Sequence, residues 1–118
     1  MICDDEIDIL EMFQAALSED YEILTADSGE DCIGKYFEEK KVKGKRIDIL
    51  LLDYRLGDMQ GDAVAKKVKE LNNVKVIIVS AYDLEEKMVE ELKHSGNIVD
   101  FIKKPVSIKC LIEKIESV

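Results

Sequence analysis

The sequence predicts an α/β fold of three layers, with a five-stranded parallel sheet between two layers of helices. Two observations predict it. Short apolar or β-branched runs alternate five times with segments of helical periodicity, and the connections between them are short. Because parallel strands need a crossover and crossovers carry helices, this alternation favours a parallel sheet with helices on both faces.

The five apolar runs are the expected strands. Residues 49–52 and 76–79 are apolar almost without interruption, as is typical of strands buried on both faces. The predicted strands are residues 1–3, 21–26, 47–52, 74–79 and 98–102.

Apolar residues spaced three and four apart predict one apolar stripe on each of five helices. Ser28 with Asp31, and Asp83 with Glu86, have the spacing of a capping box, the first with Asp in place of the usual Glu. Residues 40–46, rich in Lys and Gly, are predicted to form a surface loop. The stripes are Ile9, Leu10, Phe13 and Leu17; Cys32, Ile33, Tyr36 and Phe37; Val64, Val68 and Leu71; Leu84, Met88 and Leu92; and Ile108, Leu111, Ile112 and Ile115.

Length and charge narrow the function. A chain of 118 residues is most simply one domain, residues 1–118. Its formal net charge of −9 gives no broad basic surface, so direct binding to nucleic acid or to an anionic membrane is not expected, and a cationic ligand or a protein partner suits it better. The apolar runs are shorter than the roughly 20 residues of a membrane span. Acidic residues begin at Asp4, unlike in a signal peptide, and a cytoplasmic location is predicted.

The three cysteines, Cys3, Cys32 and Cys110, are far apart and have apolar neighbours. No Cys-x-x-Cys or Cys/His pairing accompanies them, so a metal site is not expected. They are predicted to be buried thiols in a reducing compartment rather than disulfide partners.

Polar side chains follow four of the five predicted strands. Asp4 and Asp5 follow the first, Asp53 the third, Ser80 the fourth and Lys104 the fifth. In an open parallel α/β sheet, ligands bind outside the carboxyl ends of the strands. The sequence therefore predicts three carboxylates, a hydroxyl and an ammonium at one edge of the sheet.

This set of groups favours phosphoryl chemistry. Three neighbouring carboxylates repel one another, so one holds a proton unless a cation relieves them. Hard carboxylate oxygens suit Mg²⁺, which prefers a few carboxylates together with phosphate oxygens. A metal, a lysine and a hydroxyl beside one carboxylate can neutralise and orient a phosphoryl group. Asp53 would then be a nucleophile that forms an aspartyl phosphate.

Four motifs now stand together: "CDDE" at 3–6, "LLDYRL" at 51–56 with Gly61 downstream, "VSAY" at 79–82 and "DFIKKP" at 100–105. On these motifs the chain resembles a response regulator receiver domain of two-component signal transduction, over essentially its whole length. The resemblance implies a flavodoxin-like (βα)5 fold with strand order 2-1-3-4-5. It also implies a signalling phosphoacceptor with intrinsic autophosphorylation and autodephosphorylation chemistry, and not a conventional enzyme.

The resemblance implies a role for each residue of the site. Asp53 accepts the phosphoryl group from a sensor histidine kinase or a phosphotransfer protein. Mg²⁺ is bound by Asp5, Asp53 and the backbone carbonyl of Arg55, and by Asp4 through a water. Lys104 pairs with the carboxylate and phosphoryl oxygens.

The resemblance further implies how the signal leaves the site. Ser80 hydrogen-bonds the phosphoryl group and moves toward it, and Phe101 occupies the aromatic switch position. The face built from the fourth helix, fifth strand and fifth helix changes on activation, and a homodimer through this face is a further expectation. Arg55 and Tyr82 tune the access of water and thereby the lifetime of the phosphorylated form.

The chain departs from the family pattern at three places. The first strand has only three residues, Gly57 replaces a common proline and should loosen its loop, and residues 96–101 contain one residue more than usual. The resemblance also suggests a cis bond between Lys104 and Pro105, the only proline in the chain, that aims the lysine inward.

Simpler interpretations of these residues remain. Asp4 and Asp5 would cap the first helix, Ser80 would only end a strand, and Phe101 would only be part of the core. One rival function is a phosphotransferase or phosphatase with an aspartyl nucleophile. Those proteins carry an Asp-x-Asp motif, whereas position 55 in this chain is Arg, which removes the general acid. The other is a receiver-like interaction module that does not accept phosphate and acts by dimerising.

Overall fold

The computed structural model describes residues 1–71, 74–94 and 96–118. These residues form a sheet of parallel strands in the order β2-β1-β3-β4-β5, which is the order implied by the resemblance. The strands are β1 (Ile2–Cys3), β2 (Thr25–Ala26), β3 (Ile49–Asp53), β4 (Lys75–Ser80) and β5 (Ile98–Lys103).

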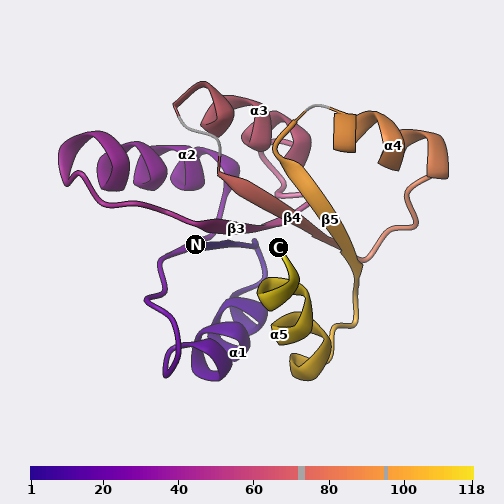
Figure 1. Ribbon diagram of the computed structural model, residues 1–118, viewed down its shortest axis with the longest axis horizontal. Helices are drawn as coiled ribbons and strands as arrows, with labels where there is room; N and C mark the ends of the chain where they lie inside the picture. Colours follow the sequence, from indigo (N-terminus) through magenta and orange to yellow (C-terminus); the bar gives the residue numbers. More distant parts are fainter. Residues whose placement is uncertain (72–73, 95) are drawn as a thin grey trace.

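Helices cover both faces of the sheet, as predicted (Figure 1). On one face lie α1 (Ile7–Leu17) and α5 (Ile108–Ser117). On the other lie α2 (Gly29–Phe37), α3 (Gly61–Leu71) and α4 (Glu86–His94). None of the helices in the described residues is both long and apolar enough to cross a bilayer.

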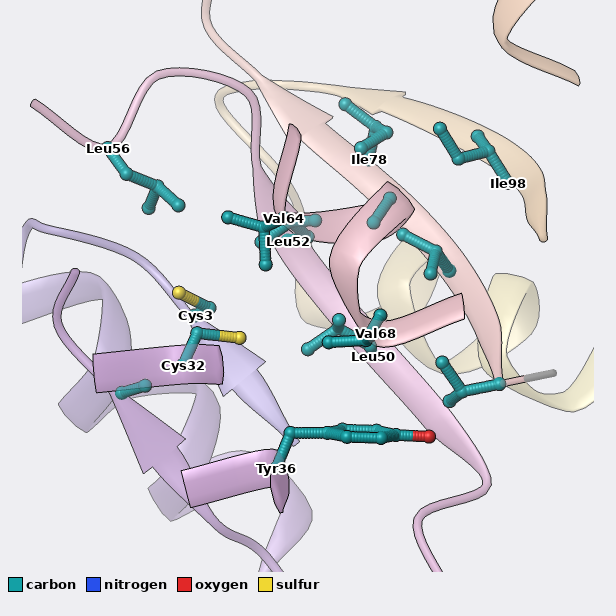
Figure 2. Packing of buried hydrophobic residues seen from close by; sticks show 14 of the residues in the cluster. Cys3, Cys32, Tyr36, Leu50, Leu52, Leu56, Val64, Val68, Ile78 and Ile98 are labelled. Atoms are coloured by element: carbon teal, nitrogen blue, oxygen red, sulfur yellow. The ribbon is translucent and has the colours of Figure 1, made fainter. Parts of the chain in front are cut away.

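The central strands divide their side chains between two apolar cores. Leu50 and Leu52 of β3 point into the core under α2 and α3, where Val64 and Tyr36 meet them (Figure 2). Leu51 points to the opposite face and joins the core under α1 and α5. This alternation follows from the two-residue period of a strand. It explains why the run before Asp53 is apolar without a break.

The free thiols are only partly as predicted. Cys3 and Cys32 are buried and lie beside each other in the core under α2 (Figure 2). The neighbouring Cys32 and burial both raise the pKa of the Cys3 thiol, and this thiol donates a hydrogen bond to the backbone oxygen of Ser28 at 3.3 Å. Cys110 on α5 is partly exposed, so the prediction of burial is wrong there.

The second predicted strand, residues 21–26, is shorter than expected, since only Thr25 and Ala26 belong to a strand. The cause is β1, which has two residues and pairs with β2 only through them. Ahead of β1, a cavity of about 490 Å³ lies between residues 21–24, which lead into β2, and residues 45–49, at the start of β3. The amino group of Met1 faces this gap and donates a hydrogen bond to the backbone oxygen of Ile49 at 2.9 Å.

The additional residue in the segment 96–101 forms a bulge in β5. Val76 pairs with Ile98, but Ile77 pairs with Asp100, so Val99 is left over between them. Beyond the bulge the ladder is regular up to the end of β4. The insertion is therefore absorbed before the strand reaches the edge where Lys104 follows it.

One predicted helix cap is present and the other is wrong. Ser28 caps α2, because its hydroxyl oxygen accepts a hydrogen bond from the backbone N–H of Asp31 at 3.0 Å. Asp83 does not cap α4, which begins three residues later at Glu86. The carboxylate of Asp83 pairs instead with Lys103 on β5.

The predicted surface loop 40–46 is also shorter than expected. The chain continues past α2 in a wider helical turn of π type, Glu38–Val42. Lys43 at the end of this turn pairs with Glu39 at 2.9 Å. Only the second half of the predicted segment is therefore a loop.

Candidate functional site

The carboxyl ends of the strands bring the predicted side chains to one edge of the sheet. Asp4, Asp53 and Ser80 are 3%, 7% and 4% exposed. Lys104 is nearly as buried, with 9% of its side chain exposed, whereas Asp5 lies at the surface. Asp4 follows β1, and Lys104 follows β5. Asp53 and Ser80 are the last residues of β3 and β4.

Lys104 holds this edge together. Its ammonium donates a hydrogen bond to Asp4 Oδ2 at 2.8 Å and lies 3.6 Å from both Asp53 Oδ2 and Glu6 Oε1. Its backbone N–H donates a hydrogen bond to the backbone oxygen of Ser80 at 2.8 Å. The peptide bond between Lys104 and Pro105 is cis, as predicted. Burial lowers the pKa of Lys104, but the hydrogen bond and attraction to Asp4, together with Asp53 and Glu6, outweigh burial and raise it. Lys104 is therefore a fixed cation.

The surroundings of Asp53 favour its neutral, protonated form. Burial and the neighbouring carboxylates of Asp4 and Asp5 raise its pKa from 3.8 to about 6, against the opposing effects of Lys104 and the backbone N–H of Arg55. One lysine therefore does not compensate the acidic groups around it. A further cation would relieve the repulsion.

The residues present fit Mg²⁺. Oxygens of Asp4, Asp5 and Glu6 lie within 4.8 Å of one another, and they are hard ligands of the kind that Mg²⁺ prefers. Glu6 was not assigned from the sequence, although it is the fourth letter of the "CDDE" motif. Its contact with Lys104 depends on the fold and is not visible in the spacing.

The structure excludes the simple helix-cap interpretation of Asp4. Helix α1 begins at Ile7, so its N-cap residue is Glu6. Asp4 Oδ1 accepts a hydrogen bond from the backbone N–H of Glu6 at 2.9 Å, and its other oxygen binds Lys104. The two carboxylate oxygens of Asp4 thus join the start of α1 to the lysine.

Glycines shape the loop that follows Asp53. Gly57 has a φ of 82°, which proline, with its φ fixed near −65°, does not adopt. The departure from the family pattern at this position therefore gives the loop a different backbone path. At Gly61 a Cβ would lie 2.6 Å from the backbone oxygen of Asp53, so only glycine fits there.

The two residues expected to tune water access contact each other. The guanidinium carbon of Arg55 lies 4.1 Å from the centre of the Tyr82 ring, a cation–π contact between the loops after β3 and β4. The backbone N–H of Tyr82 donates to Ser80 Oγ at 3.0 Å. Tyr82 is 51% exposed, whereas Ser80 is buried.

Phe101 is partly buried and packs against the core under α2 and α3. Its ring centre lies 5.9 Å from the ammonium of Lys93 on α4. One residue earlier, Asp100 pairs with Lys114 of α5 at 3.0 Å. Neighbouring positions on β5 thus contact the helices on either side of it.

Comparison with known proteins assigns the chain to a family. The family model described as the response regulator receiver domain matches residues 1–116. The chain belongs to this family. Receiver domains are signalling proteins rather than classical enzymes, commonly bind Mg²⁺, and partner with histidine kinases or phosphotransfer proteins.

Individual relatives agree with the family match. The nisin biosynthesis regulatory protein NisR of Lactococcus lactis is 30% identical over 118 residues, which are 99% of this chain and 48% of that protein. The transcriptional regulatory protein ZraR of Salmonella typhimurium is also 30% identical, over 98% of this chain and 25% of that protein. The chain therefore spans half or less of the length of these curated relatives.

Solved structures share the fold. A CheY-like receiver domain protein from Methanospirillum hungatei superimposes with a TM-score of 0.83 at 28% identity, covering 98% of this chain and 88% of that one. The structure of a CheX–CheY–BeF3–Mg²⁺ complex from Borrelia burgdorferi gives a TM-score of 0.84 at 27% identity, with 98% and 84% covered.

Proposed function

We propose that residues 1–118 are one receiver domain in which Asp53 accepts a phosphoryl group from a sensor histidine kinase or a phosphotransfer protein in a Mg²⁺-dependent reaction. One observation carries the proposal. The carboxylate of Asp53 is buried at the sheet edge, 3.6 Å from the Lys104 ammonium, among acidic neighbours that raise its pKa to about 6. This arrangement supplies a nucleophile, a fixed cation and a place for a second cation.

In this reaction an Asp53 carboxylate oxygen attacks phosphorus as the bond from phosphorus to the histidine nitrogen breaks, and the imidazole leaves with the electron pair. Asp5, Asp53 and the backbone carbonyl of Arg55 would hold Mg²⁺, with Asp4 acting through a water. Bound Mg²⁺ neutralises charge on the phosphoryl oxygens. Lys104, already held by Asp4 at 2.8 Å, is positioned to pair with one of those oxygens.

The signal would leave through Ser80. Its hydroxyl oxygen accepts a hydrogen bond from the backbone N–H of Tyr82 in the structure. A hydrogen bond donated by this hydroxyl to a phosphoryl oxygen would draw the Ser80 side chain toward Asp53. Movement there and at Phe101 would change the α4-β5-α5 face and control an output or a partner, including a second copy of the chain. We expect this phosphoryl transfer to take place in the cytoplasm.

Uptake of phosphate from a small donor tests the proposal directly. Incubation with acetyl phosphate and Mg²⁺ is expected to add one phosphoryl group to the intact protein, measured by mass spectrometry. Chelation of Mg²⁺ with EDTA should prevent the addition, because the acidic edge then repels the donor. A wild-type protein that gains no phosphoryl group with Mg²⁺ present would instead support an interaction module that does not accept phosphate.

Replacing Tyr82 with alanine is expected to shorten the life of the phosphorylated form several-fold. The substitution removes the ring that stacks on Arg55 and so opens a path for water to the phosphoryl group. The decay of the phosphorylated mass after removal of the donor measures the effect. Tyr21→Ala, at an exposed tyrosine outside these loops, is the matched control and should decay like wild type. An unchanged lifetime in Tyr82→Ala would contradict the role of the stack.

A further inference from the structure

Asp58 ties the loop after β3 to the start of α2. Its Oδ1 accepts a hydrogen bond from the backbone N–H of Gly29 at 2.9 Å, and its Oδ2 accepts one from Glu30 at 2.9 Å. These are the first two residues of α2, whose amides have no partner within the helix. The two bonds, with that from Glu30 the stronger influence, hold the pKa of Asp58 below its usual value. The loop is thus joined to a segment 28 or 29 residues earlier in the chain.

The loop that carries Asp58 is closed at its base. Arg55 forms an antiparallel bridge with Gln60, and the backbone N–H of Leu56 donates to the oxygen of Met59 at 3.1 Å. Asp58 lies at the tip of this closed loop, directly after Gly57. A displacement of the tip therefore carries the base with it, including the backbone of Arg55.

A second contact joins the same two segments. The side chain of Met59 packs so closely on Gly29 that a Cβ there would overlap it. The apolar contact and the two hydrogen bonds of Asp58 act side by side at the start of α2. Together they fix the loop in position and not only in conformation.

We propose that Asp58 is a positioning residue for the Mg²⁺ site, because it anchors the 55–60 loop to α2 and thereby holds the backbone carbonyl of Arg55 in place. This inference rests on the proposed function, in which that carbonyl is a ligand. Asp58 does not itself join the acidic cluster. It acts through the loop, and the start of α2 is the support against which the loop is held.

A purely structural role as a helix cap is the alternative, and α2 offers a matched control for it. Ser28 also serves this helix end, through its hydrogen bond from the Asp31 N–H at 3.0 Å. Ser28 directly precedes α2, whereas Asp58 comes from the 55–60 loop. Removal of either group weakens the helix start, but only removal of Asp58 also takes away hydrogen bonds that hold the loop.

Mg²⁺ binding measured by titration calorimetry separates the two roles. Asp58→Ala is expected to raise the Kd for Mg²⁺ by about tenfold, as is common when a residue supporting a metal ligand is lost. Asp58→Asn, which keeps one acceptor oxygen, should fall between Asp58→Ala and wild type. Ser28→Ala should keep the wild-type Kd, although it lowers the thermal midpoint. In phosphoryl uptake from acetyl phosphate, Asp58→Ala should need more Mg²⁺ for half-maximal rate while its rate at saturating Mg²⁺ stays close to wild type.

Each outcome bears on the inference. An unchanged Kd in a folded Asp58→Ala protein overturns it, because Asp58 then does not support the metal site. An equal rise of Kd in Ser28→Ala also overturns it, because weakening the start of α2 would then be enough to weaken Mg²⁺ binding. In either case wild-type phosphoryl uptake with Mg²⁺ would leave the proposed function standing. A wild-type protein that binds no Mg²⁺ overturns the inference and the proposed Mg²⁺-dependent function together.

Discussion

Replacement of Asp53 by asparagine is expected to reduce phosphoryl uptake to the detection limit while leaving the fold intact. Asparagine has nearly the same shape but no carboxylate oxygen to attack phosphorus. Intact mass after incubation with acetyl phosphate and Mg²⁺ measures the loss. Asp48→Asn, at an exposed aspartate just before β3, is the matched control and should take up one phosphoryl group like wild type. An equal adduct in Asp53→Asn would mean that another side chain is the acceptor.

The same substitution is expected to raise the thermal midpoint at pH 7 when Mg²⁺ is absent. The pKa of Asp53 is about 6 in the folded protein and 3.8 as its ordinary value, so folding favours the protonated form. The stability that this shift provides is fully present below pH 3.8 and is lost as pH rises through about 6. At pH 7 the ionised group is a net cost, which asparagine removes. The advantage of Asp53→Asn should therefore shrink as pH falls below 6, as measured by circular dichroism melts.

Sequence reasoning located the acidic edge because of a general property of parallel sheets. Residues that directly follow a strand end at the same edge, so Asp4, Asp53, Ser80 and Lys104 could be grouped before any coordinates were known. The structure confirms this grouping by the ion pairs of Lys104 with Asp4 and Asp53. A residue that directly follows a strand can therefore be assigned to this edge without knowledge of its side-chain contacts.

The parts that sequence reasoning missed depend on the path of the backbone between strands. Asp58, directly after Gly57 with its positive φ, reaches the start of α2, and its partner amides lie almost thirty positions away. Asp83 has the spacing of a helix cap but pairs with Lys103, which the bulged strand β5 brings near. Such contacts follow from tertiary packing, which overrides local propensity.

The extent of β2 was missed for a related reason. Residues 21–26 have strand character, yet a strand forms only where a neighbour offers backbone groups. That neighbour is β1, whose Ile2 pairs with Thr25 on one side and with Leu51 on the other. Extrapolating this parallel register, three further positions ahead of Met1 would face residues 21–23 and 47–49. These segments line the cavity of about 490 Å³.

A chain extended by three β-branched residues ahead of Met1 is therefore expected to be more stable, by about 2–3 kcal/mol in the free energy of unfolding. Burying an apolar side chain contributes about 1.5–3 kcal/mol. Ordering each added residue costs roughly 1–2 kcal/mol. Urea denaturation measures the difference. An extension of Gly-Ser-Gly is the control of equal length, and equal stability of the two extended proteins would contradict strand formation in the cavity.

The amino group of Met1 gives this prediction an independent signature. Burial lowers its pKa from 8.0 to about 6, although it already occupies a ladder position through its bond to Ile49. Between these two pH values the unfolded chain binds the proton more readily than the folded chain, so stability falls as pH is lowered from 8 to 6. In either extended chain this amine becomes a peptide N–H, which makes the same ladder bond without a charge. The pH dependence that this amine causes should then disappear in both extended proteins, whereas the apolar extension should remain more stable than the Gly-Ser-Gly extension at every pH in this window.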